Sequence, residues 1–482
     1  MAIAKEKQLP IWLKLLYGSG DFGISSVGTM RSLFLAIYLT DVVGLEPRLA
    51  SFGGLFGIIW DAVNDPLVGL LTDRVKSKWG RRRPFLIWFA IPFGLSFVIL
   101  WSAPNWNSQI ALLIYVTISF MLADTFQTLI SVPYLALTPE LTPDYDERTR
   151  LTSFRSFFQL LSVLLVSITA PNIVNDVVIA GGTQQQGFML VGAIFGFVGA
   201  IPLILIAIFV REHTTIEEEE PLPFRETLRL AWQNIPFRYG VGIYMLNWSA
   251  GDMIIVMFPY FLRYWMAGGN SIATVRFFGF DIAILSAFFA IMMPVSVLVI
   301  PFWLWVARVS DKRNAYMFGM GIWVIAQLLF ITIQPGQMIY LRYVAALIGV
   351  GVSAAYVLPD SMFADIIEWD ELRTGRRQEG IYFGIRAFVR KLSGAFVVFL
   401  ALQLLGWFGY RAPADNMAQF TQTDSALTVI RLLVSPFGAV MLSGTIILTW
   451  LFPLTRRKHQ RIQGLLERRR QKLAEQDVFV PE

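Results

Sequence analysis

Long apolar runs are the feature that most restricts how this chain can fold. About twelve stretches are apolar over roughly 20 residues or more, the length that an α-helix needs to cross a bilayer. They lie near 13–40, 48–72, 84–103, 108–135, 151–171, 187–210, 238–266, 280–307, 314–334, 339–366, 380–408 and 430–452. Charged residues make up only 15% of the 482, against about 25% in soluble domains. The chain is therefore predicted to be an all-α membrane protein with twelve transmembrane helices.

Cysteine and histidine usage excludes several kinds of chemistry. The chain has no cysteine, so disulfides and thiolate metal sites are ruled out. Its two histidines, His213 and His459, fall in polar connections rather than in the predicted spans. A histidine side chain is therefore not expected to carry protons inside the membrane. We expect no cofactor, and no cleavable signal peptide because the first apolar run has full length.

Basic residues are concentrated on one side of the predicted membrane. They follow the even-numbered spans, at Arg74, Lys76, Lys78, Arg81, Arg82, Arg83, Arg308, Lys312, Arg313, Arg373, Arg376 and Arg377, and they recur in the tail. Lysine and arginine favour the cytoplasmic side, so both termini are expected there, in a multi-pass protein of the inner cell membrane. The same rule and attraction to anionic membrane lipid explain the basic tail, so no nucleic-acid partner is expected.

A long polar break divides the spans into two sets of six. It reads REHTTIEEEEPLPFRETLR and runs from Arg211 to Arg229. The expected organisation is an N-terminal six-helix bundle, a cytoplasmic linker, a C-terminal six-helix bundle and a basic cytoplasmic tail, over residues 1–210, 211–237, 238–453 and 454–482. Two related halves are the plan of many secondary transporters, whose site lies near the midplane between the halves. We expect a monomer.

The sequence WDAVNDPLVG places two carboxylates in the middle of the second predicted span. Each such charge costs roughly 2.5–3.5 kcal/mol at a helix centre, so it needs a partner in the bundle interior. Asp61 and Asp65 are four residues apart and share a helix face with Asn64. Two close carboxylates cannot both ionise unless a cation lies between them. This pattern indicates a site for Na⁺ or H⁺; the alternative is that basic residues such as Arg155 or Lys391 pair with the carboxylates structurally.

Three motifs carry a resemblance to a known family. The stretch from Gly69 to Arg83 resembles the loop signature of the major facilitator superfamily, and WVARVSDKRN echoes part of it after the eighth span. Taken with WDAVNDPLVG, this GRRRP loop and FADIIEWDELRTGRRQEGIYFG resemble the glycoside–pentoside–hexuronide:cation symporters. The resemblance covers most of the chain. It implies the major facilitator fold, in two six-helix halves, and symport by alternating access.

The resemblance also implies roles for particular residues. The family's coupling-cation ligands fall on Asp61, Asn64, Asp65 and Thr128. Its helix-eleven lysine falls on Lys391, which would pair with the carboxylates when the cation leaves. A charge network that closes the cytoplasmic mouth falls on Arg148, Asp365 and Glu368. All of these residues match the family in type.

The sugar-contacting positions of the family match poorly. Two aspartates are replaced by Ser25 and Ser131, a tryptophan is replaced by Asp360, and Arg155 lies beside the position of an arginine. These four are the candidate solute contacts, although Asp360 could instead form a salt bridge to Arg386 or Lys391. We expect a small polar solute, a sugar or a glycoside, carried with Na⁺ or H⁺.

Two other functions were weighed. A related branch of the same fold carries lysophospholipids and shares the aspartates and the lysine, and the loss of the sugar contacts fits it. The stretch from Arg376 to Gly384 has instead the form found in bacterial sugar symporters. GSGD, Gly18 to Asp21, superficially resembles a motif of intramembrane aspartyl proteases, but a second catalytic motif is lacking. An enzyme is therefore not expected.

Overall fold

Helices dominate the computed structural model, which describes residues 9–75, 77–142, 144–210, 232–375, 379–413 and 419–477. The first half contains α1 (Ile11–Ile37), α2 (Pro47–Arg74), α3 (Arg83–Leu100), α4 (Gln109–Leu141), α5 (Tyr145–Ile179) and α6 (Gln184–Phe209). The second half contains α8 (Ile235–Tyr260), α9 (Ile284–Val309), α10 (Lys312–Leu329), α11 (Met338–Thr374), α12 (Glu379–Trp407), α13 (Asp424–Leu432) and α14 (Gly438–Leu451). Most of the expected linker, 211–231, lies outside the described residues.

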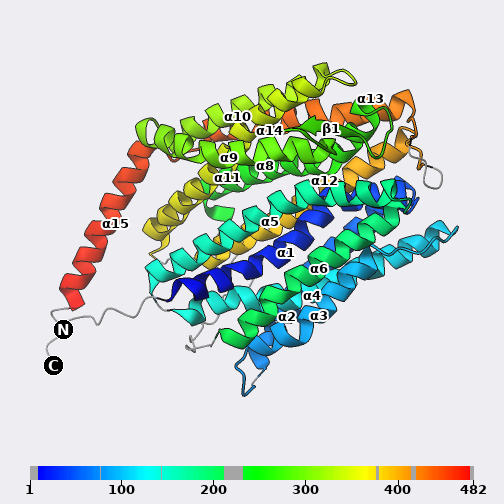
Figure 1. Cartoon of the computed structure of the whole chain (residues 1–482). Coiled ribbons are helices and arrows are strands. Elements are labelled where there is room, and N and C mark those ends of the chain that lie inside the picture. The colour runs from blue at the N-terminus through cyan, green and yellow to red at the C-terminus, as the bar shows by residue number, and fades with distance from the viewer. Residues whose placement is uncertain are drawn as a thin grey trace.

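The two halves lie side by side with their helices roughly parallel (Figure 1). Within the first half α1 packs on α5 and α6, and α3 packs on α6; within the second half α11 packs on α9 and α10. Between the halves α2 packs on α12, α5 on α9 and α1 on α8. The site expected at the interface would therefore be bounded by these six helices.

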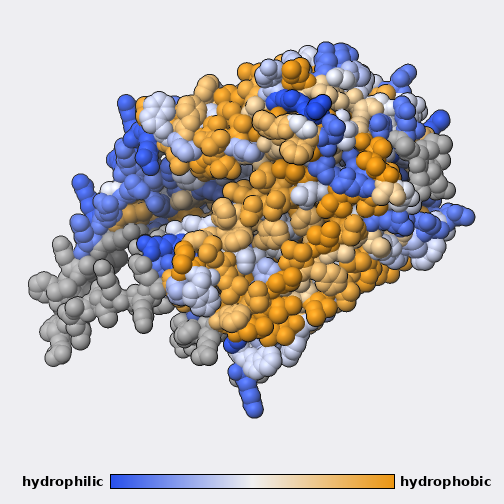
Figure 2. All heavy atoms as spheres, viewed as in Figure 1, coloured by the Kyte–Doolittle hydropathy of each residue, from blue (hydrophilic) through white to orange (hydrophobic). Residues whose placement is uncertain are grey.

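Eleven helical segments of the described chain are long and apolar enough to cross a membrane. The expected second span, α2, is 28 residues long but is missing from this set. Asp61, Asn64 and Asp65 interrupt its apolar run, which lowers its hydropathy without shortening the helix. Space-filling Figure 2 shows an apolar band across the visible face of the bundle, with hydrophilic side chains gathered toward its two ends. This distribution is that of a multi-pass membrane protein.

The two ends of the bundle differ. We call the end where α1 begins and α15 (Arg456–Asp477) lies the tail face, and the end that carries β1 (Thr274–Phe277) and β2 (Phe280–Ala283) the hairpin face (Figure 1). The strands pair antiparallel from Thr274↔Ala283 to Phe277↔Phe280. The connecting residues Phe278 and Gly279 both have positive φ, 48° and 91°, as a tight two-residue turn requires. The prediction of helical structure alone missed this hairpin, and the expected run near 280–307 begins as a helix only at Ile284.

Close helix packing in the first half depends on small residues. Gly23 of α1 faces Gly199 of α6 so closely that a Cβ atom on Gly23 would lie 2.2 Å from the Gly199 carbonyl oxygen. A larger residue at either position would push the two helices apart. Small residues allow this approach between membrane helices, where van der Waals contact replaces the hydrophobic effect as the driving force.

Candidate functional site

The paired carboxylates of α2 lie at the interface between the two halves. Because Asp61 and Asp65 are one helical turn apart, both reach the same neighbour, Lys391 of α12. The Lys391 Nζ atom lies 2.6 Å from Asp61 Oδ2 and also forms an ion pair with Asp65. All three side chains are partly exposed, so solvent reaches this group from within the protein. The sequence had left this lysine as one of two possible partners, and the structure brings it, rather than Arg155, to the pair.

Helix α4 supplies Thr128, and α2 itself supplies Asn64, the two remaining predicted members of the cation site. The Thr128 hydroxyl donates a hydrogen bond of 3.2 Å to Asp65 Oδ1. One turn earlier, the Trp60 indole donates to the Thr125 hydroxyl at 2.9 Å and so fixes α2 against α4. Asn64 is buried on the same stretch of α2, and its Nδ2 atom has no hydrogen-bond partner among the residues that the structure describes. A buried amide without a partner is costly, which indicates that this part of α2 is built for more than packing.

The charges of this group do not cancel. Asp61 and Asp65 together carry two negative charges when ionised, and Lys391 supplies one positive charge. One further monovalent cation or one proton would neutralise the pair. Within the described ranges no cluster of three or more His, Cys, Asp or Glu side chains could hold a metal ion.

The candidate solute residues occupy both halves. Arg155 of α5 donates to Asp21 Oδ2 at 2.6 Å and lies over the Tyr134 ring at 5.2 Å. Asp360 of α11 pairs with Arg386 at 2.5 Å, which realises one of the two salt bridges considered for it, yet 59% of its side chain stays exposed. Ser25 and Ser131 are both partly exposed, and neither hydroxyl has a hydrogen-bond partner among the described residues.

The second half also carries an arginine–aromatic surface that the sequence reasoning did not single out. Arg386 lies over the Tyr244 ring at 4.4 Å, and Arg390 lies over the Trp248 ring at 4.3 Å. Arg390 also forms a two-bond pair with buried Asp252. The helical spacing of Tyr244, Trp248 and Asp252, matched by that of Arg386 and Arg390, was visible in the sequence and could have indicated two facing helices.

The expected gate residues are not brought together. Arg148 donates to the backbone carbonyls of Thr142 and Pro139 in its own half. Asp365 pairs with Lys312 at 2.7 Å, and Glu368 pairs at 2.8 Å with His459 of α15. The carboxylates thus have partners in the second half and its tail, and among the described residues neither forms an ion pair with Arg148. His459 was missed because its position in a polar tail gave no sign of where α15 would dock.

Two bundles of membrane helices with an ion-paired carboxylate site between them define a secondary transporter of the major facilitator type. The fold agrees with that of a bacterial homologue of the human lysosomal transporter Spinster, solved in an inward-facing and occupied conformation. The TM-score is 0.63 at 12% identity, over 93% of this chain and 97% of that one. A family profile described as MFS/sugar transport protein matches residues 16–456, and the chain belongs to this family.

Relatives with assigned names are symporters. A protein of Synechocystis sp., named as an uncharacterized symporter, is 31% identical over 96% of this chain and 98% of its own. A putative glycoside/cation symporter of Escherichia coli is 27% identical over 98% of each chain. A sodium-dependent lysophosphatidylcholine symporter of Xenopus tropicalis is 24% identical over 95% of this chain and 90% of its own. The predicted family is confirmed, and the protein is a transporter rather than an enzyme.

Proposed function

We propose that this protein is a cation-coupled symporter that moves a small polar solute, a sugar or a glycoside, by alternating access. The observation that supports this most strongly is the Lys391 ammonium between Asp61 and Asp65, because it joins the two halves through the pair expected to hold the coupling cation. The name of the Escherichia coli relative, a putative glycoside/cation symporter, supports the same solute class and the same kind of coupling.

Coupling follows from competition for the carboxylates. A Na⁺ ion or a proton entering between Asp61 and Asp65 takes over the neutralising role of Lys391. The ammonium then leaves α2, and one of the ties between α2 and α12 is released. Thr128 stays on Asp65 and offers a further oxygen to the ion. Without the cation, the lysine returns and the halves are held in one arrangement. Cation binding therefore biases the conformational equilibrium as symport requires.

The orientation belongs to this proposal. The described basic residues Arg74, Lys78, Arg313 and Arg373 lie at helix ends or in loops of the tail face, and α15 adds Arg456 to Arg469. Basic residues favour the cytoplasmic side, so we assign the tail face to the cytoplasm of an inner-membrane protein. In this orientation α2 also crosses the membrane, which brings the eleven apolar helices to twelve spans. Its carboxylates face α12 instead of lipid. The structure is then open inward and closed outward.

A lysophospholipid is the second candidate solute. The Xenopus tropicalis relative carries that name, and the two serines at the sugar-contact positions fit a site without sugar-clamping carboxylates. The arginine–aromatic surface of the second half favours a polar solute instead. Exposed Asp360 and partly exposed Trp248 offer a hydrogen-bond acceptor and a ring face, the combination that binds hydroxylated rings.

A thermal-shift screen distinguishes the two solutes. Purified protein would be mixed with pentoses, hexoses, glycosides and lysophosphatidylcholine, each with and without Na⁺ at two pH values. A sugar or glycoside that raises the melting temperature more in the presence of the coupling cation is the expected result, because a bound ligand stabilises the folded state by mass action. Stabilisation by lysophosphatidylcholine alone would contradict the proposed solute class.

Asp360 is expected to contact the solute in addition to Arg386. Replacing Asp360 by alanine should weaken solute binding at least about tenfold, because a hydrogen bond to a charged group contributes roughly 1.5–3 kcal/mol. Titration calorimetry with the best ligand of the screen measures this change. Asp281→Ala, which removes an exposed carboxylate from the hairpin, is the matched control and should leave affinity unchanged. Equal affinity in Asp360→Ala and the parent would reduce Asp360 to a partner of Arg386.

A further inference from the structure

A single carboxylate of the first half contacts two segments of the second half at the hairpin face: the π-helical turn Phe261–Met266 that extends α8, and the residues that follow α12. Asp41 lies in the π-helical turn Tyr38–Val42 that extends α1. Its Oδ2 atom lies 2.8 Å from Arg263 Nη1 and accepts a 2.5 Å hydrogen bond from the Tyr264 hydroxyl. Its Oδ1 atom accepts from the Tyr410 hydroxyl, beyond the end of α12. We call Asp41, Arg263, Tyr264 and Tyr410 the Asp41 latch.

The latch is closed to solvent. The Asp41 side chain is 0% exposed, the Arg263 side chain is 10% exposed, and both tyrosines are buried. A neighbouring bond, 2.9 Å between the hydroxyls of Thr40 and Tyr260, also crosses between the halves. A charge in such surroundings is stable only while its partners remain in place. Separation of the halves at the hairpin face must therefore break every contact of the latch together.

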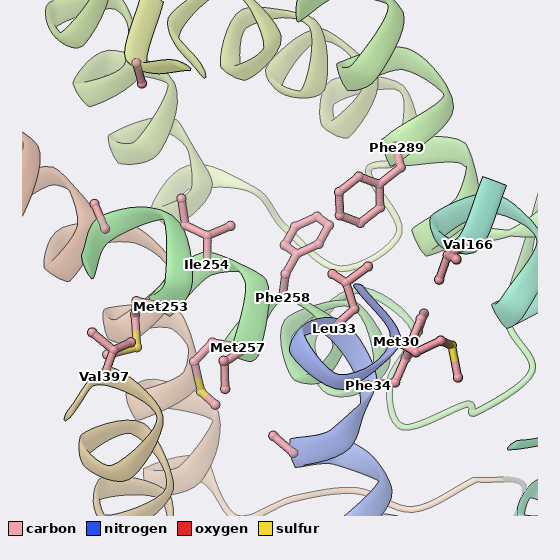
Figure 3. Packing of buried hydrophobic residues seen from close by; sticks show 14 of the residues in the cluster. Met30, Leu33, Phe34, Val166, Met253, Ile254, Met257, Phe258, Phe289 and Val397 are labelled. Carbon is pink, nitrogen blue, oxygen red and sulfur yellow. The ribbon is translucent and has the colours of Figure 1, made fainter. Parts of the chain in front are cut away.

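An apolar seam continues the closure below the latch. Figure 3 shows Leu33 of α1 next to Phe258 of α8, with Phe289 of α9 beyond it. All three side chains are buried, so the halves meet in apolar contact at this level. The tail-face residues Arg148, Asp365 and Glu368, by contrast, pair only within their own halves. The halves are therefore joined by polar contacts at the hairpin face, while the expected pairs of Arg148 with Asp365 and Glu368 are not formed at the tail face.

We infer that the Asp41 latch is the gate at the hairpin face: it holds the transporter closed on that side and must open before solute can enter there. The inference rests on the proposed function only for the direction of transport. Asp41 and Arg263 carry the ion pair, while Tyr264 and Tyr410 orient the carboxylate. None of the four contacts the cation site, so they position the two halves and do not bind the coupling ion.

The absence of native cysteine allows a direct test. Spin labels on Asp176→Cys of α5 and Thr428→Cys of α13, two exposed helical positions of opposite halves near the hairpin face, report its opening by pulsed electron resonance. The parent should show mainly the short distance. Asp41→Asn should raise the ratio of long to short distances about tenfold or more, equivalent to about 1.4 kcal/mol. Arg263→Lys, which keeps the charge, should restore much of the short-distance population relative to Arg263→Gln.

Glu147→Gln is the matched control, because it removes a buried carboxylate whose partner, Lys14, lies in the same half. It should leave the distances unchanged. If Asp41→Asn fails to fold, the double variant Tyr264→Phe/Tyr410→Phe decides, since it removes two donors and keeps the charge pair. Parental distances in the folded latch variants would overturn the inference. The measurement requires no solute, so an error in the proposed solute class would leave this result unaffected.

Discussion

Replacing Asp61 or Asp65 by asparagine is expected to abolish gradient-driven accumulation in reconstituted vesicles. Either change removes one of the two carboxylates for which Lys391 and the coupling cation compete. With a neutral solute, one charge crossing 100 mV gains about 2.3 kcal/mol, which supports roughly fifty-fold accumulation. The variants should instead stop near equal concentrations inside and outside. Uptake of the ligand identified by the thermal-shift screen measures this ratio.

The control for these variants lies outside the cation site. Glu147 of α5 is buried and pairs with Lys14 at 2.8 Å inside the first half. Glu147→Gln therefore removes a buried carboxylate without altering the charge of the Lys391 pair, and it should retain the dependence on the gradient. Exchange of solute across the membrane without a gradient should persist in Asp61→Asn if the protein is folded. Full uphill uptake by both aspartate variants would remove the pair from the coupling mechanism.

Replacing Lys391 by alanine should strengthen cation binding, whereas loss of either aspartate removes a ligand of the cation. The ammonium competes with the cation for Asp61 and Asp65, so its loss should tighten cation binding at least about tenfold, or about 1.4 kcal/mol. The same change should lower accumulation, because an occupied site can no longer be emptied by the returning lysine. Cation titrations by thermal shift, paired with uptake, separate the two effects.

A lysine inside one half provides the comparison for Lys391→Ala. Lys14 pairs with Glu147 at 2.8 Å and both are buried in the first half. Lys14→Ala is expected to reduce stability without changing the cation affinity. Unchanged cation affinity together with normal coupling in Lys391→Ala would show that the lysine is only a structural partner of the carboxylates.

Much of the fold, and the pairing of Asp61 and Asp65 with a basic residue, could be predicted from the sequence. Apolar runs define membrane helices because the bilayer sets their length. Two carboxylates in the middle of such a run have few explanations, so Asp61 and Asp65 stood out. The partner Lys391 followed from the resemblance and from the need for a basic residue. The sequence could not show whether Lys391 or Arg155 pairs with the carboxylates, because it does not indicate which helices of the two halves are in contact.

Other parts of the protein could not be predicted because their contacts depend on distant segments or on conformation. Asp41 lies at the end of the first apolar run, where a charge costs little, and its phenol partners are 223 and 369 residues away. The pairing of Arg148 with Asp365 and Glu368 stays a prediction. In this structure Lys312 and His459 pair with the two carboxylates, and the sequence alone does not indicate these partners.

Counting the cation bound per chain tests the central claim most directly. Equilibrium binding of radioactive sodium to the purified protein, with proton uptake on solute addition recorded in parallel, would be compared with the Asp61→Asn/Asp65→Asn double variant. The account predicts about one Na⁺, or about one proton, per parent chain, since one cation replaces the single ammonium of Lys391 at the carboxylates. It predicts none for the double variant. The same stoichiometry in both proteins would contradict the account.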